Sequence, residues 1–287
     1  MAGRIPHQTI TINTALSSAR QRLADISETA ALDARVLLAH LLNKDKSWLL
    51  AHPEAPLSRS QAAAFNNAVK LLQSGAPLPY LLGEWEFFGL SFVVTPDVLI
   101  PRPETELLVE TALDWIKESG NPVKAAEAGT GSGCIAVSLA VNAANLHLTA
   151  TDISPKAIEI AQRNADRHHV SNQISFLEND LLLGLTGPYE LICANLPYIP
   201  TETLGNLDVS RHEPETAMDG GEDGLDHIRR LLPQAANLLS EEGLLLMEIE
   251  ADQGKAVKRL AAEAFPEAGI QVKSDLANKD RLLVVHT

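Results

Sequence analysis

The sequence predicts an α/β protein in which a mostly parallel seven-stranded sheet with an antiparallel C-terminal hairpin follows a small helical bundle. Residues 1–75 place apolar side chains at helical spacing and show almost no strand pattern. From about residue 104, strand-like and helix-like segments alternate, which is typical of an open parallel sheet with helices on both faces. The last two strand-like segments are separated only by "LANK", which is too short for a crossover helix, so we expect them to be antiparallel.

Three apolar stripes predict the helices of the N-terminal bundle. They comprise Leu16, Ala19, Leu23 and Ile26; then Ala34, Leu37, Leu38 and Leu41; then Ala64, Ala68 and Leu71. Glycine and prolines in "SGAPLPY" should end the third helix and begin a linker. Two short aromatic and β-branched runs around Gly89 then predict a hairpin. We therefore expect a helical domain over 1–80, a linking hairpin over 81–97 and a larger α/β domain over 98–287.

Seven strand-like segments make up the predicted sheet. They are 123–126, "LHLTATD" (146–152), "ISFLEND" (174–180), "YELICANLP" (189–197), "GLLLMEIE" (243–250), "IQVKSD" (270–275) and "RLLVVHT" (281–287). The helical segment "CIAVSLAVNAA" follows the first, and helical patterns follow the second, fourth and fifth.

Composition narrows the classes of partner. The 287 residues are 45% hydrophobic and carry a formal charge of −14, so no global positive field would attract a nucleic acid, and a protein or small-molecule partner is favoured. Cys134 and Cys193 have neither CxxC nor zinc-like spacing, so we expect no disulfide framework, no metal and a reducing, cytoplasmic location. There is no signal-peptide pattern and no apolar run of the roughly 18–20 residues that a membrane span needs.

A glycine-rich turn lies between the first predicted strand and its helix. In "EAGTGSGCIA", Gly129, Thr130, Gly131, Ser132 and Gly133 would let backbone N–H groups approach a ligand closely. At the end of the second strand, Asp152 could accept both hydroxyls of a ribose, which indicates a nucleoside-containing cofactor. The turn also loosely fits a dinucleotide fingerprint, but Glu127 suits the cationic amine of S-adenosylmethionine and would repel a pyrophosphate.

The third predicted strand ends in a further candidate. Asp180 could accept a hydrogen bond from an adenine amino group while Leu181 packs on the ring, because ligands of such sheets bind at the carboxyl ends of strands. The alternative is an ordinary carboxylate in a strand-end turn.

Five segments together resemble one family. "GTGSGCIA", "PLPYLLGEWEFFGL", "VLIPRPETELLVE", "ANLPYIP" and "EPETAMDGGEDGLDHIRRLL" resemble the HemK or PrmC family of protein-(glutamine) methyltransferases that modify peptide chain release factors. "PRPETE" separates this family from its sister enzymes that methylate a glutamine of a ribosomal protein. The resemblance implies the Rossmann-like fold of class I methyltransferases. It also implies S-adenosylmethionine as cofactor, held by the glycine turn, Asp152 and the Asp180–Leu181 region.

The same resemblance assigns the substrate site to Asn195, Leu196, Pro197 and Tyr198, with Asn195 also bordering the cofactor. An amide NH2 is a poor nucleophile, so the side-chain oxygen of Asn195 and the carbonyl of residue 196 would accept its two N–H bonds while Tyr198 covers its flat face. Pro197 would fix the bend. The family's usual second residue is proline; the Asn-Leu-Pro-Tyr form is similar to rRNA adenine dimethyltransferases, so adenine remains an alternative target.

The resemblance also extends to three charged residues and to the helical N-terminal domain. The resemblance places Arg102 and Glu104 near the substrate mouth and marks Glu213 as part of the family pattern, although Glu104 could simply favour a helix N-terminus. It implies that the helical N-terminal domain helps to recognise the release factor; the alternative is a folding cap. A non-catalytic cofactor-binding scaffold is the remaining alternative for the whole chain.

Overall fold

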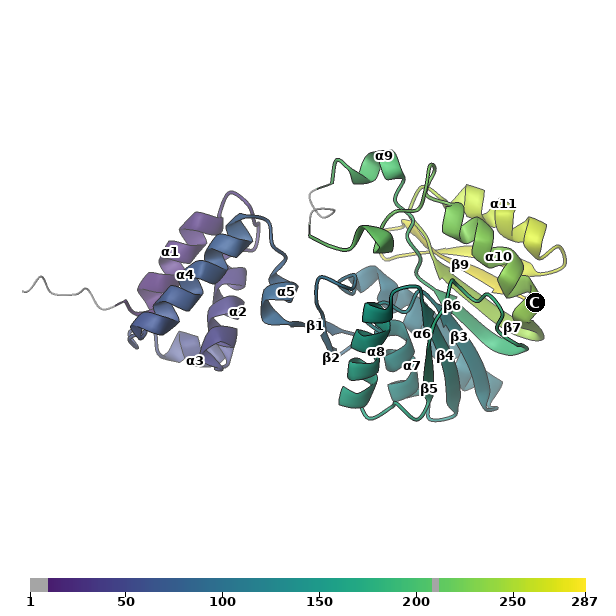
Figure 1. Cartoon of the computed structure of the whole chain (residues 1–287), viewed down its shortest axis with the longest axis horizontal. Coiled ribbons are helices and arrows are strands. Elements are labelled where there is room, and N and C mark those ends of the chain that lie inside the picture. The colour runs from purple at the N-terminus through teal and green to yellow at the C-terminus, as the bar shows by residue number, and fades with distance from the viewer. Residues whose placement is uncertain (1–9, 208–211) are drawn as a thin grey trace, which may run out of the picture. The chain divides into compact units, whose positions relative to one another are not determined.

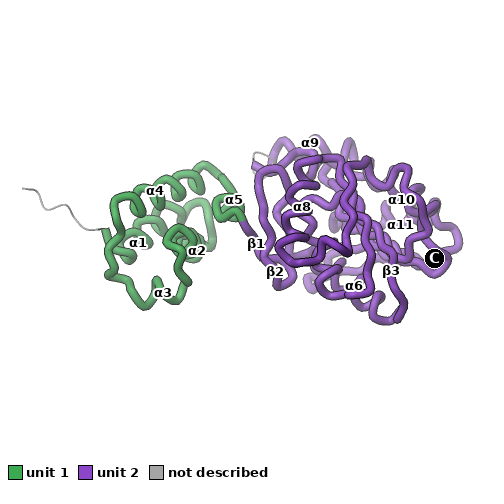
Figure 2. The backbone as a smooth tube through the Cα atoms, turned by 60° about the horizontal axis from the view of Figure 1, so that its bottom comes forward, with its two compact units in different colours: residues 1–83 green, residues 84–287 purple. Residues whose placement is uncertain are grey.

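The computed structural model describes residues 10–207 and 212–287. Residues 1–9 lie outside this description. They belong to the N-terminal segment in which we expect no signal peptide. The chain divides into two compact units, residues 1–83 and residues 84–287 (Figure 2). The hairpin expected to link two domains belongs to the second unit.

The N-terminal unit is a bundle of helices around its own apolar core. Its helices are α1 (Ile12–Leu23), α2 (Ala30–Leu42), α3 (Lys46–Ala51), α4 (Arg59–Gln73) and α5 (Leu78–Leu82). Thr11 and Ser58 begin α1 and α4 with capping boxes, in which side chain and backbone satisfy each other's free donors. The short helix α5 occupies part of the predicted linker, because a proline is tolerated in a first helical turn, where its missing N–H has no partner.

The predicted apolar stripe of α4 is wrong. Ala64 and Leu71 are exposed, and the buried face consists of Ala62, Phe65 and Val69. Phe65 is 1% exposed and is the largest apolar side chain of this helix, so its burial determines which face turns to the core. Ile26, assigned to the first stripe, lies beyond the end of α1 and is exposed.

The second unit begins with the hairpin of β1 (Glu84–Phe87) and β2 (Leu90–Val93) and continues into one large sheet. The strands of that sheet are β3 (Val123–Ala128), β4 (Leu146–Asp152), β5 (Ile174–Glu178), β6 (Tyr189–Ala194), β7 (Leu239–Glu248), β8 (Gly269–Ser274) and β9 (Asp280–His286). Their order is β5-β4-β3-β6-β7-β9-β8; β9 pairs antiparallel with both β7 and β8, and the other pairs are parallel. The predicted fold is confirmed.

Helices cover both faces of this sheet (Figure 1). Helices α6 (Glu106–Ser119), α7 (Cys134–Asn142) and α8 (Pro155–Arg167) pack on one face, and α10 (Asp226–Leu238) and α11 (Gly254–Ala264) pack on the other. Short turns η1 (Pro103–Thr105), α9 (Thr201–Leu204) and η3 (Glu215–Ala217) lie in the connections. Within residues 10–207 and 212–287, no helix is long and apolar enough to cross a membrane.

The strand order reverses between β3 and β6. The chain adds β4 and β5 on one side of β3, then returns to place β6 and β7 on the other side. At such a reversal the loops after two neighbouring strands turn apart and leave a crevice at their carboxyl ends. The glycine turn follows β3 and Asn195 follows β6, so both border this crevice.

Candidate active site

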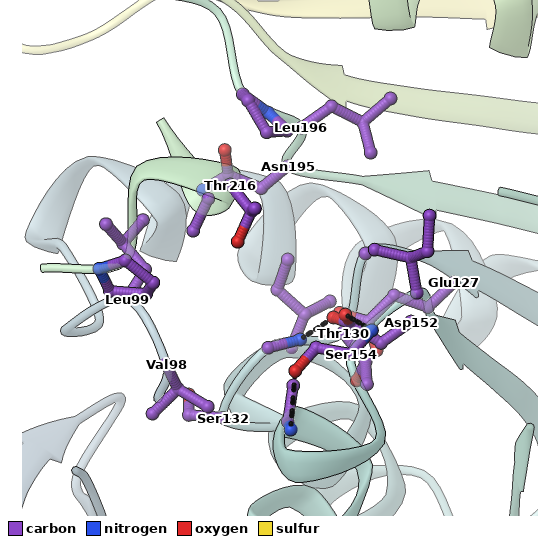
Figure 3. Close-up of a pocket in the computed structure, with 18 of the residues that line it drawn as sticks. Val98, Leu99, Glu127, Thr130, Ser132, Asp152, Ser154, Asn195, Leu196 and Thr216 are labelled. Carbon is purple, nitrogen blue, oxygen red and sulfur yellow. Dashed lines mark hydrogen bonds between the residues drawn. The ribbon is translucent and has the colours of Figure 1, made fainter. Parts of the chain in front are cut away.

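A pocket opens at the carboxyl ends of β3, β4 and β6. Figure 3 shows Val98 and Leu99 on one side, Glu127, Thr130 and Asp152 on another, and Asn195 with Thr216 at one end. The predicted site residues that line it are Arg102, Glu127, Gly129, Thr130, Gly131, Ser132, Asp152, Asp180, Leu181, Asn195, Leu196 and Pro197. Glu104, Gly133, Tyr198 and Glu213 are not among its lining residues.

The glycine turn is held against the carboxylate of Asp152. The N–H of Gly131 donates to Asp152 Oδ2 at 2.8 Å, and the N–H of Ser154 donates to Oδ1 at 2.9 Å. Each carboxylate oxygen can accept a second bond, so the site retains acceptors for two hydroxyls. Gly133 adopts a φ of +79° at the start of α7, where a Cβ would lie 3.0 Å from the Cβ of Ala161. Glycine therefore lets this turn pack closely on α8.

Glu127 is a fully buried carboxylate beside the turn. Its Oε2 accepts a bond of 2.7 Å from the hydroxyl of Thr130, whereas its buried Oε1 has no hydrogen-bond partner. Burial raises the pKa of Glu127 to about 7, and the nearby charge of Asp152 adds to the rise. An unpartnered acidic oxygen in a pocket fits a cationic amine, because the cation would supply the missing partner and favour the ionised form.

Asp180 lies two residues beyond the end of β5, and it already has a partner. Arg230 of α10 forms an ion pair with its carboxylate. Leu181 adopts a φ of +52° and is buried, and its carbonyl accepts a bond of 2.8 Å from the hydroxyl of Thr151. The apolar side chain of Leu181 and the Asp180–Arg230 pair thus lie together at the pocket wall.

Asn195 is the first residue after β6, and a hydrogen bond to Thr105 holds its side chain. Its Nδ2 donates to Thr105 Oγ1 at 3.0 Å. Leu196 is 4% exposed, and a Cβ at Gly129 would lie 3.0 Å from its Cδ2. The leucine side chain therefore packs over the glycine turn. The backbone carbonyl of residue 196 is present whether that residue is leucine or proline.

Tyr198 is held mainly through its backbone. Gln253 donates from Nε2 to the carbonyls of Tyr198 at 3.1 Å and Gly224 at 3.0 Å. A Cβ at Gly224 would lie only 2.2 Å from the Tyr198 carbonyl oxygen, so that position requires glycine. Burial raises the pKa of the Tyr198 phenol, and the charges of Glu248 and Glu250 contribute. The phenol is therefore neutral across the ordinary pH range.

Arg102 and Glu213 join two loops at the pocket. The buried carboxylate of Glu213 accepts a bond of 3.1 Å from the N–H of Ile100 and forms an ion pair with Arg102. Glu213 thus contacts Arg102, which lines the pocket, but does not line it itself. Glu104 is exposed.

The sequence alone did not indicate four residues that lie at or near the site: Thr105, Arg230, Glu248 and Gln253. A usable signal existed for Glu248, since it interrupts the apolar run "GLLLMEIE" at the end of a strand expected to lie in the core. No such signal marked Thr105 or Arg230, which reach the site only through tertiary packing. Among the described residues, no group of three or more His, Cys, Asp or Glu side chains could hold a metal ion.

Comparison with known proteins agrees with the resemblance. Residues 14–83 match the PrmC N-terminal domain, and residues 104–207 match the methyltransferase small domain. A release factor glutamine methyltransferase of Moorella thermoacetica is 42% identical over 96% of this chain and 99% of its own, and one of Coxiella burnetii is 37% identical over 96% and 98%. A methyltransferase from Pyrococcus furiosus, 18% identical, shares the fold with a TM-score of 0.53 over 70% of this chain and 90% of its own. The chain belongs to the family of release factor glutamine methyltransferases.

Proposed function

We propose that this chain transfers a methyl group from S-adenosylmethionine to the side-chain amide nitrogen of a glutamine in peptide chain release factors. One observation carries the proposal: the Asn195–Pro197 turn lines the same pocket as Glu127, Asp152 and the glycine turn. A nucleoside cofactor and an NH2-bearing substrate would therefore meet there. The name shared by relatives that align over both units supports the choice of substrate.

The cofactor site follows from the groups described above. Glu127 Oε1, which lacks a partner, would hold the methionine amine, and Asp152 would accept the ribose hydroxyls. Leu181 and Asp180 would border the adenine. When bound, S-adenosylmethionine supplies an electrophilic methyl group on a sulfonium sulfur.

The substrate site depends on two acceptors. Since Thr105 accepts a bond from Asn195 Nδ2, Oδ1 is the side-chain atom left to accept from a substrate N–H, and the carbonyl of Leu196 would accept the other. The nitrogen lone pair would then be fixed in direction without a strong base. Holding two reactants in near-attack geometry can lower a barrier by about 7–11 kcal/mol. The surplus proton would leave to water after transfer.

The release factor is the partner that we propose for this site. The formal charge of −14 disfavours binding to a nucleic acid backbone. The N-terminal unit, which matches the PrmC N-terminal domain, would contribute to recognition of the factor. Because such a substrate is a translation factor, the protein would act in the cytoplasm.

The experiment offers the protein two substrates. Purified protein is incubated with methyl-labelled S-adenosylmethionine and either a bacterial release factor or rRNA, because the Asn-Leu-Pro-Tyr form is similar to that of rRNA adenine dimethyltransferases. We expect label in the release factor and none in the RNA. Label in RNA alone would replace the proposed substrate by adenine, and binding of the cofactor without turnover on either substrate would support a scaffold.

A further inference from the structure

Glu248 is a buried carboxylate with no role in the reaction proposed above. In the parallel pairing of β6 and β7, Ala194 is the partner of Met247. Asn195 and Glu248 are the next residues along these two neighbouring strands. Glu248 is 3% exposed, and its Oε2 has no hydrogen-bond partner. A buried carboxylate is unfavourable for folding unless it is well paired, so its place beside the substrate turn calls for a functional explanation.

The polar neighbours of Glu248 are the two side chains behind the proposed substrate site. Asn195 Nδ2 donates to Thr105 Oγ1 at 3.0 Å. Both side chains lie near enough to the Glu248 carboxylate to lower its pKa by hydrogen bonding. An amide nitrogen has two N–H bonds, whereas a hydroxyl can accept one bond and donate another. The three side chains can therefore form a closed network in which both N–H bonds of Asn195 point away from the substrate.

We propose that ionised Glu248 is a positioning residue that holds Asn195, directly and through Thr105, with its Oδ1 turned toward the substrate NH2. This inference rests on the proposed function and assigns no contact between Glu248 and the substrate. A carboxylate accepts hydrogen bonds only, so it selects the orientation of Asn195 in which Nδ2 faces it. A protonated carboxyl group can donate instead, and the opposite amide orientation then becomes compatible with the network.

The surroundings make this choice sensitive to pH. Burial raises the pKa of Glu248 to about 7; Glu104 adds to the rise, while Thr105, Arg281 and Asn195 oppose it. The phenol of Tyr198 and the thiol of Cys134 also face this charge, and burial raises the pKa of both, so they stay neutral near pH 7. Loss of the Glu248 charge below about pH 7 should therefore lower kcat.

Glu127 titrates in the same range, but the two groups differ in what they affect. Glu127 lies in the proposed cofactor site, so its protonation should weaken cofactor binding. Glu248 acts behind Asn195, so its protonation should lower kcat even when the cofactor is saturating. Measuring kcat at saturating S-adenosylmethionine at each pH separates them.

Four variants test the network. Glu248→Gln keeps the shape and removes the charge; Thr105→Val removes the hydroxyl, and Thr105→Ser retains it. Glu250→Gln is the matched control, since this carboxylate lies two residues further along, is half exposed and belongs to neither proposed site. We expect kcat toward a release factor to fall roughly 10-fold or more in Glu248→Gln and Thr105→Val, with wild-type cofactor Kd, and to be largely retained in the other two.

The pH profile and a spectroscopic readout complete the test. The acidic decline of kcat should be present in the wild type and absent in Glu248→Gln. In 15N–1H spectra of the full chain, the Asn195 side-chain amide, assigned by its loss in Asn195→Ala, should shift with a midpoint near pH 7, and this shift should disappear in Glu248→Gln. Wild-type kcat in Glu248→Gln, or an Asn195 amide that ignores pH, would overturn the inference. Should the wild type not methylate a release factor, the proposed function fails and the amide titration still decides the role of Glu248.

Discussion

Replacing Glu127 by glutamine isolates the charge that we place opposite the cofactor amine. Glutamine keeps the shape and can still accept the bond from the Thr130 hydroxyl, but it cannot pair with a cation as a carboxylate does. A hydrogen bond to a charged group contributes about 1.5–3 kcal/mol. At about 1.4 kcal/mol for each tenfold change, Glu127→Gln should raise the Kd for S-adenosylmethionine by roughly 10-fold to 100-fold.

The raised pKa of Glu127 gives this prediction a pH dependence. If binding needs the ionised carboxylate, wild-type affinity should rise as pH increases toward 7 and level off above it, whereas the variant should lack this dependence. The free protein should behave in the opposite way. A carboxyl group whose folded pKa exceeds its unfolded value stabilises the fold below the unfolded pKa, and that contribution is lost as pH rises through the folded pKa.

The size of that loss follows from the two pKa values. The rise from 4.5 to about 7, at about 1.36 kcal/mol per pKa unit, corresponds to roughly 3 kcal/mol. The free energy of unfolding of Glu127→Gln relative to wild type should therefore increase by about this amount between pH 4.5 and pH 8.

Calorimetric titration with S-adenosylmethionine at several pH values, together with urea unfolding of the free protein, measures both effects. Glu178→Gln is the matched control, because this carboxylate ends β5 at the edge of the same sheet, is exposed and does not line the pocket. An unchanged Kd in Glu127→Gln, or an equal loss in Glu178→Gln, would refute the assignment of Glu127 to the amine.

Three further substitutions test other parts of the site. Asn195→Ala removes the proposed acceptor for the substrate N–H, so turnover should fall at least ~100-fold in a methylation assay while cofactor Kd stays nearly constant; unchanged turnover would remove Asn195 from the mechanism. Gly133→Ala should lower the free energy of unfolding in urea by about 1–3 kcal/mol, because the φ of Gly133 is +79° and an added Cβ would be crowded. In the control Gly205→Ala, the added Cβ would have no neighbouring atom within 4 Å, so stability should change little. Asn164→Ala removes a buried amide that bonds to the backbone of Val93 in both directions and to the glycine turn; it should cost about 2 kcal/mol or more and speed hydrogen exchange at the Val93 amide, and wild-type exchange there would contradict the role of this side chain.

The sheet could be predicted because its signals are local. "LHLTATD" gives the exact bounds of β4, and the short "LANK" connection correctly requires β8 and β9 to be antiparallel. In α4, by contrast, small alanines occur on several faces, so spacing alone could not select the buried one. Only packing around Phe65 decides that face.

Some residues of the candidate site could likewise be predicted from local sequence, and others could not. Asp152 and the glycine turn follow directly from strands that can be read in the sequence, and the structure brings them within hydrogen-bond distance of each other. Thr105 and Glu248 are 143 residues apart in the sequence and meet beside Asn195 only because η1 and β7 both end there. Tertiary contacts of this kind have no local sequence pattern, so the sequence pointed to the exposed Glu104 and not to the buried Thr105 beside it.

The most direct test of the central claim is a fragmentation mass spectrum of a release factor after reaction with this protein and S-adenosylmethionine. We expect one added methyl group on a single peptide, localised to the side-chain amide of a glutamine, and its loss when Asn195 is replaced by alanine. A methyl group on another kind of side chain, or an unmodified release factor in the presence of bound cofactor, would contradict it.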